Sequence, residues 1–282
     1  VYPKAVAKSL GIHPDGLSFE ADEQETTPDQ ETTPDQASSQ KNLETVLAEG
    51  LAPVNFNEKI YLAASGHAAD MAEDIKNNGY YAETSQNGRT LADRLEDQGY
   101  QAAHSGEVPG TLTTETDGVT ASDAARLLLE ARLKGEFDPA ETNQIVLNNL
   151  MEEAGIAFLS SAVASPGALE RTAHLLVADF AAPVSDMPKG PYLMGTVFKD
   201  LDGDGLYDPA EGLSDVQITV TDSKGNDDIV FTDSAGGFQV PVTGGFYLTT
   251  AYLPEGEETV NLEIGEANVP VRFIVEAPTN NG

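Results

Sequence analysis

The sequence has no cysteine and no tryptophan, and it contains only 15 lysine and arginine residues but 47 aspartate and glutamate residues. Without cysteine no disulfide bond can form, so stability outside a cell must come from packed cores or from bound metal. The net charge of −32 argues against nucleic acid and anionic membranes as partners, because this surface would be repelled by both. Divalent cations are the natural partners of dense carboxylates, although an acidic surface can also serve only for solubility in salty surroundings.

Long apolar runs are also lacking. The longest uncharged run, near Ala154–Leu169, is short and contains Pro166 and Gly167, so no membrane span is predicted. The chain begins at Val1 and not at Met, which we interpret as a mature form whose signal peptide has been removed. We therefore expect a secreted protein that is extracellular or attached to a cell surface.

Composition divides the chain into three parts. Residues 1–52 are an N-terminal arm and a low-complexity linker, in which the hexapeptide Glu-Thr-Thr-Pro-Asp-Gln occurs twice, at 25–30 and 31–36. This repeat is polar and punctuated by proline, so it cannot build a core. Residues 53–182 combine helical periodicity with apolar strands. After a linker, the pattern of residues 192–276 is that of short strands separated by turns rich in Gly and Asp.

The helices and strands expected in residues 53–182 are predicted from the periodicity of apolar residues and from residues typical of helix ends. Thr90 and Asp93 resemble a capping box, and the run Asp138-Pro139-Ala140-Glu141 is typical of a helix start. The other expected elements are a helix with Ile60–Ile75 on one face that ends at Gly79, a helix over Ala124–Lys134, and strands over Gly155–Val163 and Thr172–Phe180. Both strands are apolar on successive residues, so we expect helices on both of their faces.

The spacing of the last part predicts an antiparallel sandwich. Its expected strands are Tyr192–Phe198, Val216–Asp222, Ile229–Thr232, Gly237–Val242, Tyr247–Tyr252, Thr259–Ile264 and Val269–Val275.

A twelve-residue acidic loop follows the first of these strands and matches the pattern of calcium-binding loops. Gly205 stands at the sixth position, where the chain must turn sharply, and Glu211 at the twelfth can chelate with both carboxylate oxygens. Hard oxygen ligands at this density favour calcium over zinc. The predicted calcium ligands are Asp200, Asp202, Asp204, the carbonyl of Leu206, Asp208 and Glu211.

The flanks of this loop are not those of an EF-hand, because a strand leads in and Pro209 and Gly212 argue against a following helix. The segments Gly195–Phe198, Gly212–Val216, Thr232–Phe238 and Gly244–Tyr247 resemble the calcium-binding B-type repeats of serine-aspartate-rich bacterial surface adhesins. This resemblance covers about residues 192–276. It implies a β-sandwich that calcium stiffens and that serves as a spacer or stalk.

Short motifs carry a second resemblance over about residues 53–181. They are His67–Ala72, Gly79-Tyr80-Tyr81, Thr84–Thr90, Asp93-Arg94-Leu95, Gly99-Tyr100, Gly155–Ala157 and Leu176–Phe180. Together they are similar to the bacterial CAP superfamily, the SCP-like or PR-1-like proteins. The resemblance implies an α-β-α sandwich and a secreted protein, so the expected fold class is α+β, with this sandwich followed by an antiparallel calcium-binding β-sandwich.

The cleft that this family presents is altered here. The resemblance puts Glu83 and, loosely, Glu141 where the family has its two histidines, and Glu107 remains from the family's Gly-Glu-Asn motif. We interpret Glu83, His104 and Glu107 as a vestigial cleft, with His104 in a loop, because carboxylates alone lack the imidazole that proton transfer near neutral pH requires. His67 is expected as a core histidine, and no serine has a recognisable base.

Two functions are compatible with these features. The first is a secreted, non-enzymatic structural or interaction protein with a degenerate CAP domain and a calcium-stiffened β-module, built into an extracellular filament or surface assembly by its N-terminal arm. The alternative is an active CAP-type protein, either a hydrolase or a binder of lipids or peptides, that uses a cleft at Glu107 and His104. The loss of the histidine pair favours the first.

Assembly through the arm gives a testable prediction. Val1, Tyr2 and Val6 are apolar and compatible with a strand, and the polar repeat behind them is a tether that provides reach. Deletion of residues 1–20 should therefore leave a folded monomer that no longer forms high-molecular-weight species on a sizing column. A full-length protein that is already monomeric with calcium at high concentration would contradict the prediction.

Overall fold

The fold is that of a computed structural model, which describes most of the chain between residues 45 and 276. Within that range the residues outside the description are 47, 49, 79–83, 86, 116–118, 138–143, 164–170, 185–190, 202, 204, 206 and 208–210. Residues 1–44 of the N-terminal arm and linker also lie outside the described residues, so the role of the arm in assembly stays a prediction. In the described part of the chain no helix is long and apolar enough to cross a membrane.

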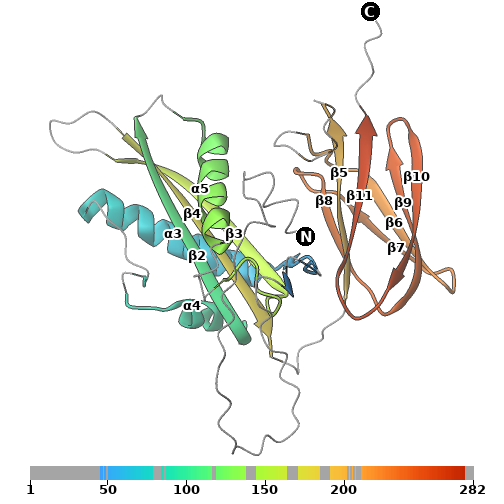
Figure 1. The fold of residues 1–282 in the computed structure, drawn as a ribbon, viewed down its shortest axis with the longest axis horizontal. Helices are drawn as coiled ribbons and strands as arrows, with labels where there is room; N and C mark the ends of the chain where they lie inside the picture. The colour runs from blue at the N-terminus through green and yellow to red at the C-terminus, as the bar shows by residue number, and fades with distance from the viewer. Residues whose placement is uncertain are drawn as a thin grey trace, which may run out of the picture. The chain divides into compact units, whose positions relative to one another are not determined.

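The chain divides into two units, and the fold class is α+β. The first unit holds Val1–Leu51 and Phe56–Val184, and the second holds Ala52–Asn55 and Ser185–Gly282, so the boundary falls within the short strand β1. The elements of the first are β1 (Asn55–Phe56), α3 (Glu58–Asn78), α4 (Leu91–Asp97), β2 (Ala102–Glu115), α5 (Ala121–Glu136), β3 (Glu153–Val163) and β4 (Arg171–Pro183). Figure 1 shows these elements along the chain.

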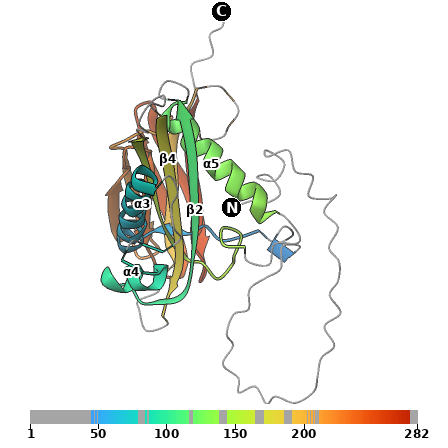
Figure 2. The same cartoon turned by 90° about the vertical axis from the view of Figure 1, so that its left-hand side faces the viewer.

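The first unit has three layers. Its sheet has the strand order β1-β3-β4-β2, and β4 pairs antiparallel with both β3 and β2. Helix α3 packs on one face, where Met71 lies in a core cluster with Leu175 and Val177 of β4. Helix α5 covers the other face, with Leu128 against Gly110 of β2. Figure 2 shows α3 and α5 on opposite sides of the sheet.

Helix α3 begins and packs as its sequence predicts. The apolar side chains that recur along one face, from Ile60 to Ile75, are buried. Its first turn lies directly on β3, where a Cβ atom at Gly155 would come within 2.0 Å of the Tyr61 backbone nitrogen. Glycine at position 155 therefore permits the close approach of helix and strand.

The capping box of α4 is confirmed. The Thr90 hydroxyl accepts a hydrogen bond from the Asp93 backbone N–H, and the Asp93 carboxylate accepts one from the Thr90 N–H. The helix over Ala124–Lys134 is also confirmed, although α5 starts earlier, behind its N-cap Thr120. The predicted helix start at Asp138 lies outside the described residues, and residues 144–150, which would continue such a helix, form turns.

Strand β2 is the main element that the sequence did not reveal. The expected loop at His104 is wrong, because His104 lies within this strand of 14 residues. Gly106, Pro109 and Gly110 gave the segment the composition of a loop. A proline is tolerated here because β2 is at the edge of the sheet and needs hydrogen bonds on one side only.

Helices cover both faces of β4 but not of β3. Strand β4 is buried from Ala173 to Pro183, as its apolar sequence predicts. On β3, Ile156 is 49% exposed, since α5 packs on β2 and β4. The expectation of helices on both faces therefore holds for one strand of the two.

The second unit consists of two sheets. Its strands are β5 (Tyr192–Asp200), β6 (Gln217–Asp222), β7 (Asp227–Phe231), β8 (Gly237–Pro241), β9 (Gly245–Leu253), β10 (Gly256–Ile264) and β11 (Val269–Glu276). One sheet has the order β10-β9-β6-β7 and the other β11-β5-β8. All seven predicted strands are present at their predicted places.

A single apolar core lies between these sheets. It joins Val197 and Phe273 of one sheet to Ile218, Val220 and Ala251 of the other. The prediction of a purely antiparallel sandwich is wrong in one respect, because β11 pairs with β5 in parallel. Spacing along the sequence cannot reveal this pairing, since the first and last strands meet only when the sandwich closes.

Candidate functional site

The acidic loop in the second unit is closed by the carboxylates at its two ends. Asp200 ends β5 and is 7% exposed, and Glu211 is 4% exposed. The Glu211 carboxylate accepts a hydrogen bond from the Leu201 backbone N–H at 2.8 Å. The Lys199 N–H donates to the Glu211 carbonyl at 2.9 Å, so the twelfth position of the loop returns to its start.

Backbone N–H groups converge on the first carboxylate of the loop. The two oxygens of Asp200 accept hydrogen bonds from the Gly203 N–H at 2.8 Å and from the Gly205 N–H at 2.9 Å. Gly205 has a φ of 72°, a left-handed conformation that side chains with a Cβ atom disfavour. The sharp turn that the sequence predicts at the sixth position is therefore present.

The remaining predicted ligands Asp202, Asp204, Leu206 and Asp208 lie outside the described residues. In the part of the chain that the structure describes, no three acidic or histidine side chains gather as a metal site. The two described ligands nevertheless suit a cation, because both are buried carboxylates and they lie at the two ends of the loop. Calcium binding by the loop remains a prediction.

Tyr207 and Asp233 extend the acidic surroundings of the loop. Burial raises the pKa of the Tyr207 hydroxyl, and the charges of Asp233 and Glu211 raise it further. Asp233 shapes its own turn by accepting hydrogen bonds from the backbone N–H groups of Ala235 and Gly237. Sequence reasoning did not single out Asp233, because it lies more than twenty positions beyond the loop.

A second cluster of charged side chains is buried in the first unit, between the sheet and helices α3 and α4. The Glu107 carboxylate on β2 forms an ion pair with the Arg94 guanidinium on α4, whose side chain is 7% exposed. Glu107 lies directly opposite Asp179 in the β2–β4 register. Two acids therefore share the surroundings of one buried arginine.

Asp179 is the most unusual member of this cluster. It is 0% exposed, and neither of its oxygens has a hydrogen-bond partner of good geometry. Burial, reinforced by the neighbouring charge of Glu107, raises its pKa to about 9. Because Arg94 pairs with Glu107, the Asp179 side chain is neutral at neutral pH and holds the proton of the carboxyl pair.

His67 and Ser85 complete the cluster. His67 on α3 is fully buried, and this burial lowers its pKa, so the imidazole is neutral. Its Nδ1 lies 3.5 Å from the Ser85 hydroxyl, and its Nε2 lies 3.6 Å from a Glu107 oxygen. The expectation of a core histidine is confirmed, although its Nε2 has no hydrogen-bond partner.

Ser85, His67 and Glu107 thus form a chain of neighbouring polar side chains with long separations. Both distances exceed the roughly 3.2 Å at which a base activates a nucleophile. Ser85 is 4% exposed, and its hydroxyl accepts a long hydrogen bond of 3.5 Å from Arg94. The arrangement holds α3, α4 and the sheet together through buried polar contacts.

Of the predicted cleft residues the structure describes His104 and Glu107, and it does not bring these two together. Glu83 lies outside the described residues. His104 is exposed on β2, three positions before Glu107, and an odd spacing puts the two side chains on opposite faces of the strand. Sequence reasoning missed Arg94 and Asp179 as site residues, although a charged residue inside the apolar run Leu176–Phe180 was a usable signal.

Comparison with known proteins gives few relatives. The sequence matches no protein-family profile and no curated protein. Among solved structures, an extracellular protein containing an SCP domain from Bacillus anthracis is similar at 20% identity and a TM-score of 0.30, over 49% of this chain and 36% of that one. The Bacillus anthracis TIE protein is similar at 19% identity and a TM-score of 0.24, over 30% of this chain and 16% of that one.

The 5-hydroxyisourate hydrolase of Klebsiella pneumoniae is also similar, at 15% identity and a TM-score of 0.24, over 30% of this chain and 90% of that one. At these identities and TM-scores, none of the three likenesses supports an argument about function. The description of the two sites therefore rests on their own residues.

The buried ion pair predicts a large effect of one substitution. Glu107→Gln should destabilise the protein by at most about 3–5 kcal/mol, because it removes the ion-pair partner of the buried Arg94. Ionisation of the neighbouring Asp179 beside Arg94 would recover part of this loss. The control is Glu130→Gln, which breaks the exposed pair with Arg126 and should cost at most about 0.5 kcal/mol. Urea unfolding measures both, and equal effects of the two substitutions would contradict the buried role of Glu107.

Asp179 predicts a dependence of stability on pH. The unfolded carboxyl loses its proton near its ordinary pKa of about 4, whereas the folded one keeps it up to about 9. This group therefore lowers the free energy of unfolding as pH rises through that window, by at most about 1.4 kcal/mol per pH unit. Asp179→Asn should remove this decrease in the free energy of unfolding. The difference in stability between the variant and the natural protein should therefore grow in favour of the variant between pH 5 and pH 8.

Unfolding by urea at several pH values tests this expectation. Glu96→Gln is the control, since it also turns a carboxylate into an amide, at an exposed position of α4. Its profile should follow that of the natural protein. An Asp179→Asn profile parallel to that of the natural protein would show that Asp179 is ionised in the fold.

Proposed function

We propose that this chain is a secreted, non-enzymatic structural or interaction protein whose C-terminal β-sandwich is made rigid by calcium. The observation that carries the proposal is the pair of buried carboxylates, Asp200 and Glu211, at the two ends of a loop with glycine turns. Positions 200–211 hold five acidic side chains and no lysine or arginine. A divalent cation supplies the missing positive charge.

The residues that would hold calcium are Asp200, Asp202, Asp204, Asp208 and Glu211, with the carbonyl of Leu206. Calcium supplies positive charge and no redox chemistry. The loop joins β5 to the strands beyond it, and the bridge between Phe198 and Gly212 fixes its base. A cation held by Asp200 and Glu211 would therefore tie the end of β5 to the residues at this bridge.

The first unit fits a structural role in the same proposal. We regard it as a degenerate CAP-like domain, on the motifs that the sequence shares with that family. Its charged cluster is buried, and Arg94 and Glu107 are bound to one another. A ligand would first have to break this pair, which favours a scaffold over a cleft.

Calcium should raise the stability of the second unit. Binding to the folded state adds about 2.7 kcal/mol when calcium is at a hundred times its dissociation constant. The melting temperature should fall in excess chelator, and Asp200→Asn should remove most of this response. Asp202→Ala is a second variant, because position 200 also accepts hydrogen bonds in the turn.

The matched control is Asp222→Asn. Asp222 accepts backbone N–H groups of Lys224 and Asn226 in the turn between β6 and β7, much as Asp200 does in its loop. This substitution should lower the melting temperature slightly and leave the response to calcium intact. A natural protein that melts identically in calcium and in chelator would sink the proposal.

A further inference from the structure

The four-stranded sheet of the second unit leaves apolar side chains on its outer face. Residues of β9 alternate, so that Ala251 lies in the core while Phe246, Leu248 and Tyr252 are 64%, 39% and 42% exposed. On the edge strand β7, Phe231 is 60% exposed. Exposed aromatic and aliphatic side chains concentrated on one sheet face are typical of a contact surface.

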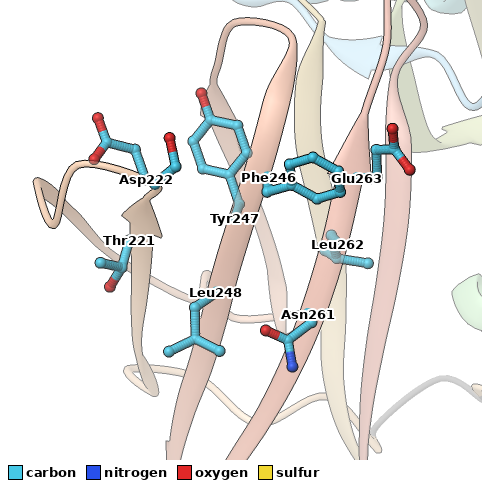
Figure 3. Close-up of a pocket in the computed structure, with 9 residues that line it drawn as sticks. Thr221, Asp222, Phe246, Tyr247, Leu248, Asn261, Leu262 and Glu263 are labelled. Atoms are coloured by element: carbon cyan, nitrogen blue, oxygen red, sulfur yellow. The ribbon is translucent and has the colours of Figure 1, made fainter.

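Part of this face is hollowed into a groove of about 390 Å³. Figure 3 shows its lining side chains, which come from β6, β9 and β10. Phe246 and Leu248 provide the apolar part, opposite Glu263 and Asn261 of β10 in the strand register. Such a groove suits an apolar side chain with a polar or charged neighbour.

Carboxylates border this groove. Glu263 lines it on β10, and Asp222 lines it on the opposite side at the end of β6. Hydrogen bonds from Asn226 lower the pKa of Asp222, so its carboxylate stays charged. An occupant that places cations beside apolar side chains would match both the floor and the border.

The first residues of this chain have that composition. Residues 1–14 contain Lys4, Lys8 and His13 and no acidic side chain, in a protein of net charge −32. Tyr2, Lys4, Val6, Lys8 and Leu10 stand at every second position, so an extended segment would present them on one face. Small residues, among them Ala5 and Ala7, fall on the other face.

We propose that residues 1–14 of one copy bind the outer groove of the second unit of another copy, with Val6 and Leu10 on Phe246 and Leu248 and the lysines beside Glu263 and Asp222. Two bodies of this net charge repel each other, and a basic arm on an acidic border offsets part of that repulsion. The inference rests on the assembly that the arm predicts and is independent of the calcium loop.

The test uses the full chain and a synthetic peptide of residues 1–14 with a fluorescent label. The acceptor is the full chain with Lys4→Glu and Lys8→Glu, which disables its own arm, and anisotropy reports binding. We expect saturable binding that weakens as salt rises. Phe246→Thr in the acceptor should weaken binding at least tenfold, and Glu263→Lys should weaken it and reduce the salt dependence.

The matched control is Phe231→Thr, which removes the same side chain at similar exposure from the same face, outside the groove. It should change peptide affinity less than twofold, and circular dichroism should show that all variants fold. The full chain carrying Phe246→Thr should also lose high-molecular-weight species on a sizing column, whereas Phe231→Thr should keep them.

Three results would overturn the proposal: no binding of the peptide, equal losses for Phe246→Thr and Phe231→Thr, or peptide binding by a full chain that stays monomeric. The last result would show that the arm folds back on its own chain. Repeating the assay in chelator separates this inference from the calcium proposal, because the groove shares no residue with the loop.

Discussion

Buried carboxylates in this protein must be stabilised with very few cationic side chains. With 47 acidic and 15 basic residues, a lysine or arginine partner for each carboxylate is arithmetically excluded. An unpaired charge in a protein interior is costly, so the fold must supply other partners. The described residues show one buried arginine partner and three substitutes for a cation: a proton, backbone N–H groups and a tyrosine hydroxyl.

Each kind of partner stabilises a carboxylate in a different part of the fold. Glu107 takes the buried arginine, and Asp179 opposite it keeps its proton. Glu136, at the end of α5, accepts hydrogen bonds from the backbone N–H groups of Ile145 and Leu147 and so fixes the segment that follows. Glu153 accepts a hydrogen bond of 2.6 Å from the Tyr100 hydroxyl, which ties β3 to the chain after α4.

The acidic loop has five carboxylates and no lysine or arginine between positions 200 and 211. The two oxygens of Asp200 already accept two backbone N–H groups, and three further aspartates follow within eight positions. A bound cation would offset this density of charge, and the proposed function therefore rests on the loop and not on the first-unit cluster.

Local patterns in the sequence were sufficient for most elements. The capping box at Thr90, the apolar face of α3 and the seven short strands of the second unit depend on neighbours within a few positions, and all of them are present. The sharp turn at Gly205 is of the same kind. Strand β2 was not predicted from the sequence, because Pro109 is tolerated in a strand only at the edge of a sheet. Whether a strand lies at the edge is decided only when the sheet assembles.

The sequence by itself determined the excess of negative charge, the division into an α/β unit and a β unit, and the spacing of the acidic loop. Each of these depends on composition or on residues that are close along the chain. Only the tertiary structure decided which carboxylates are buried together. Glu107 and Asp179 are 72 positions apart (179 less 107), and they meet because β2 and β4 pair in one register. The same pairing put His104 on the other face from Glu107, since a strand alternates its side chains and a one-residue change in register reverses every one of them.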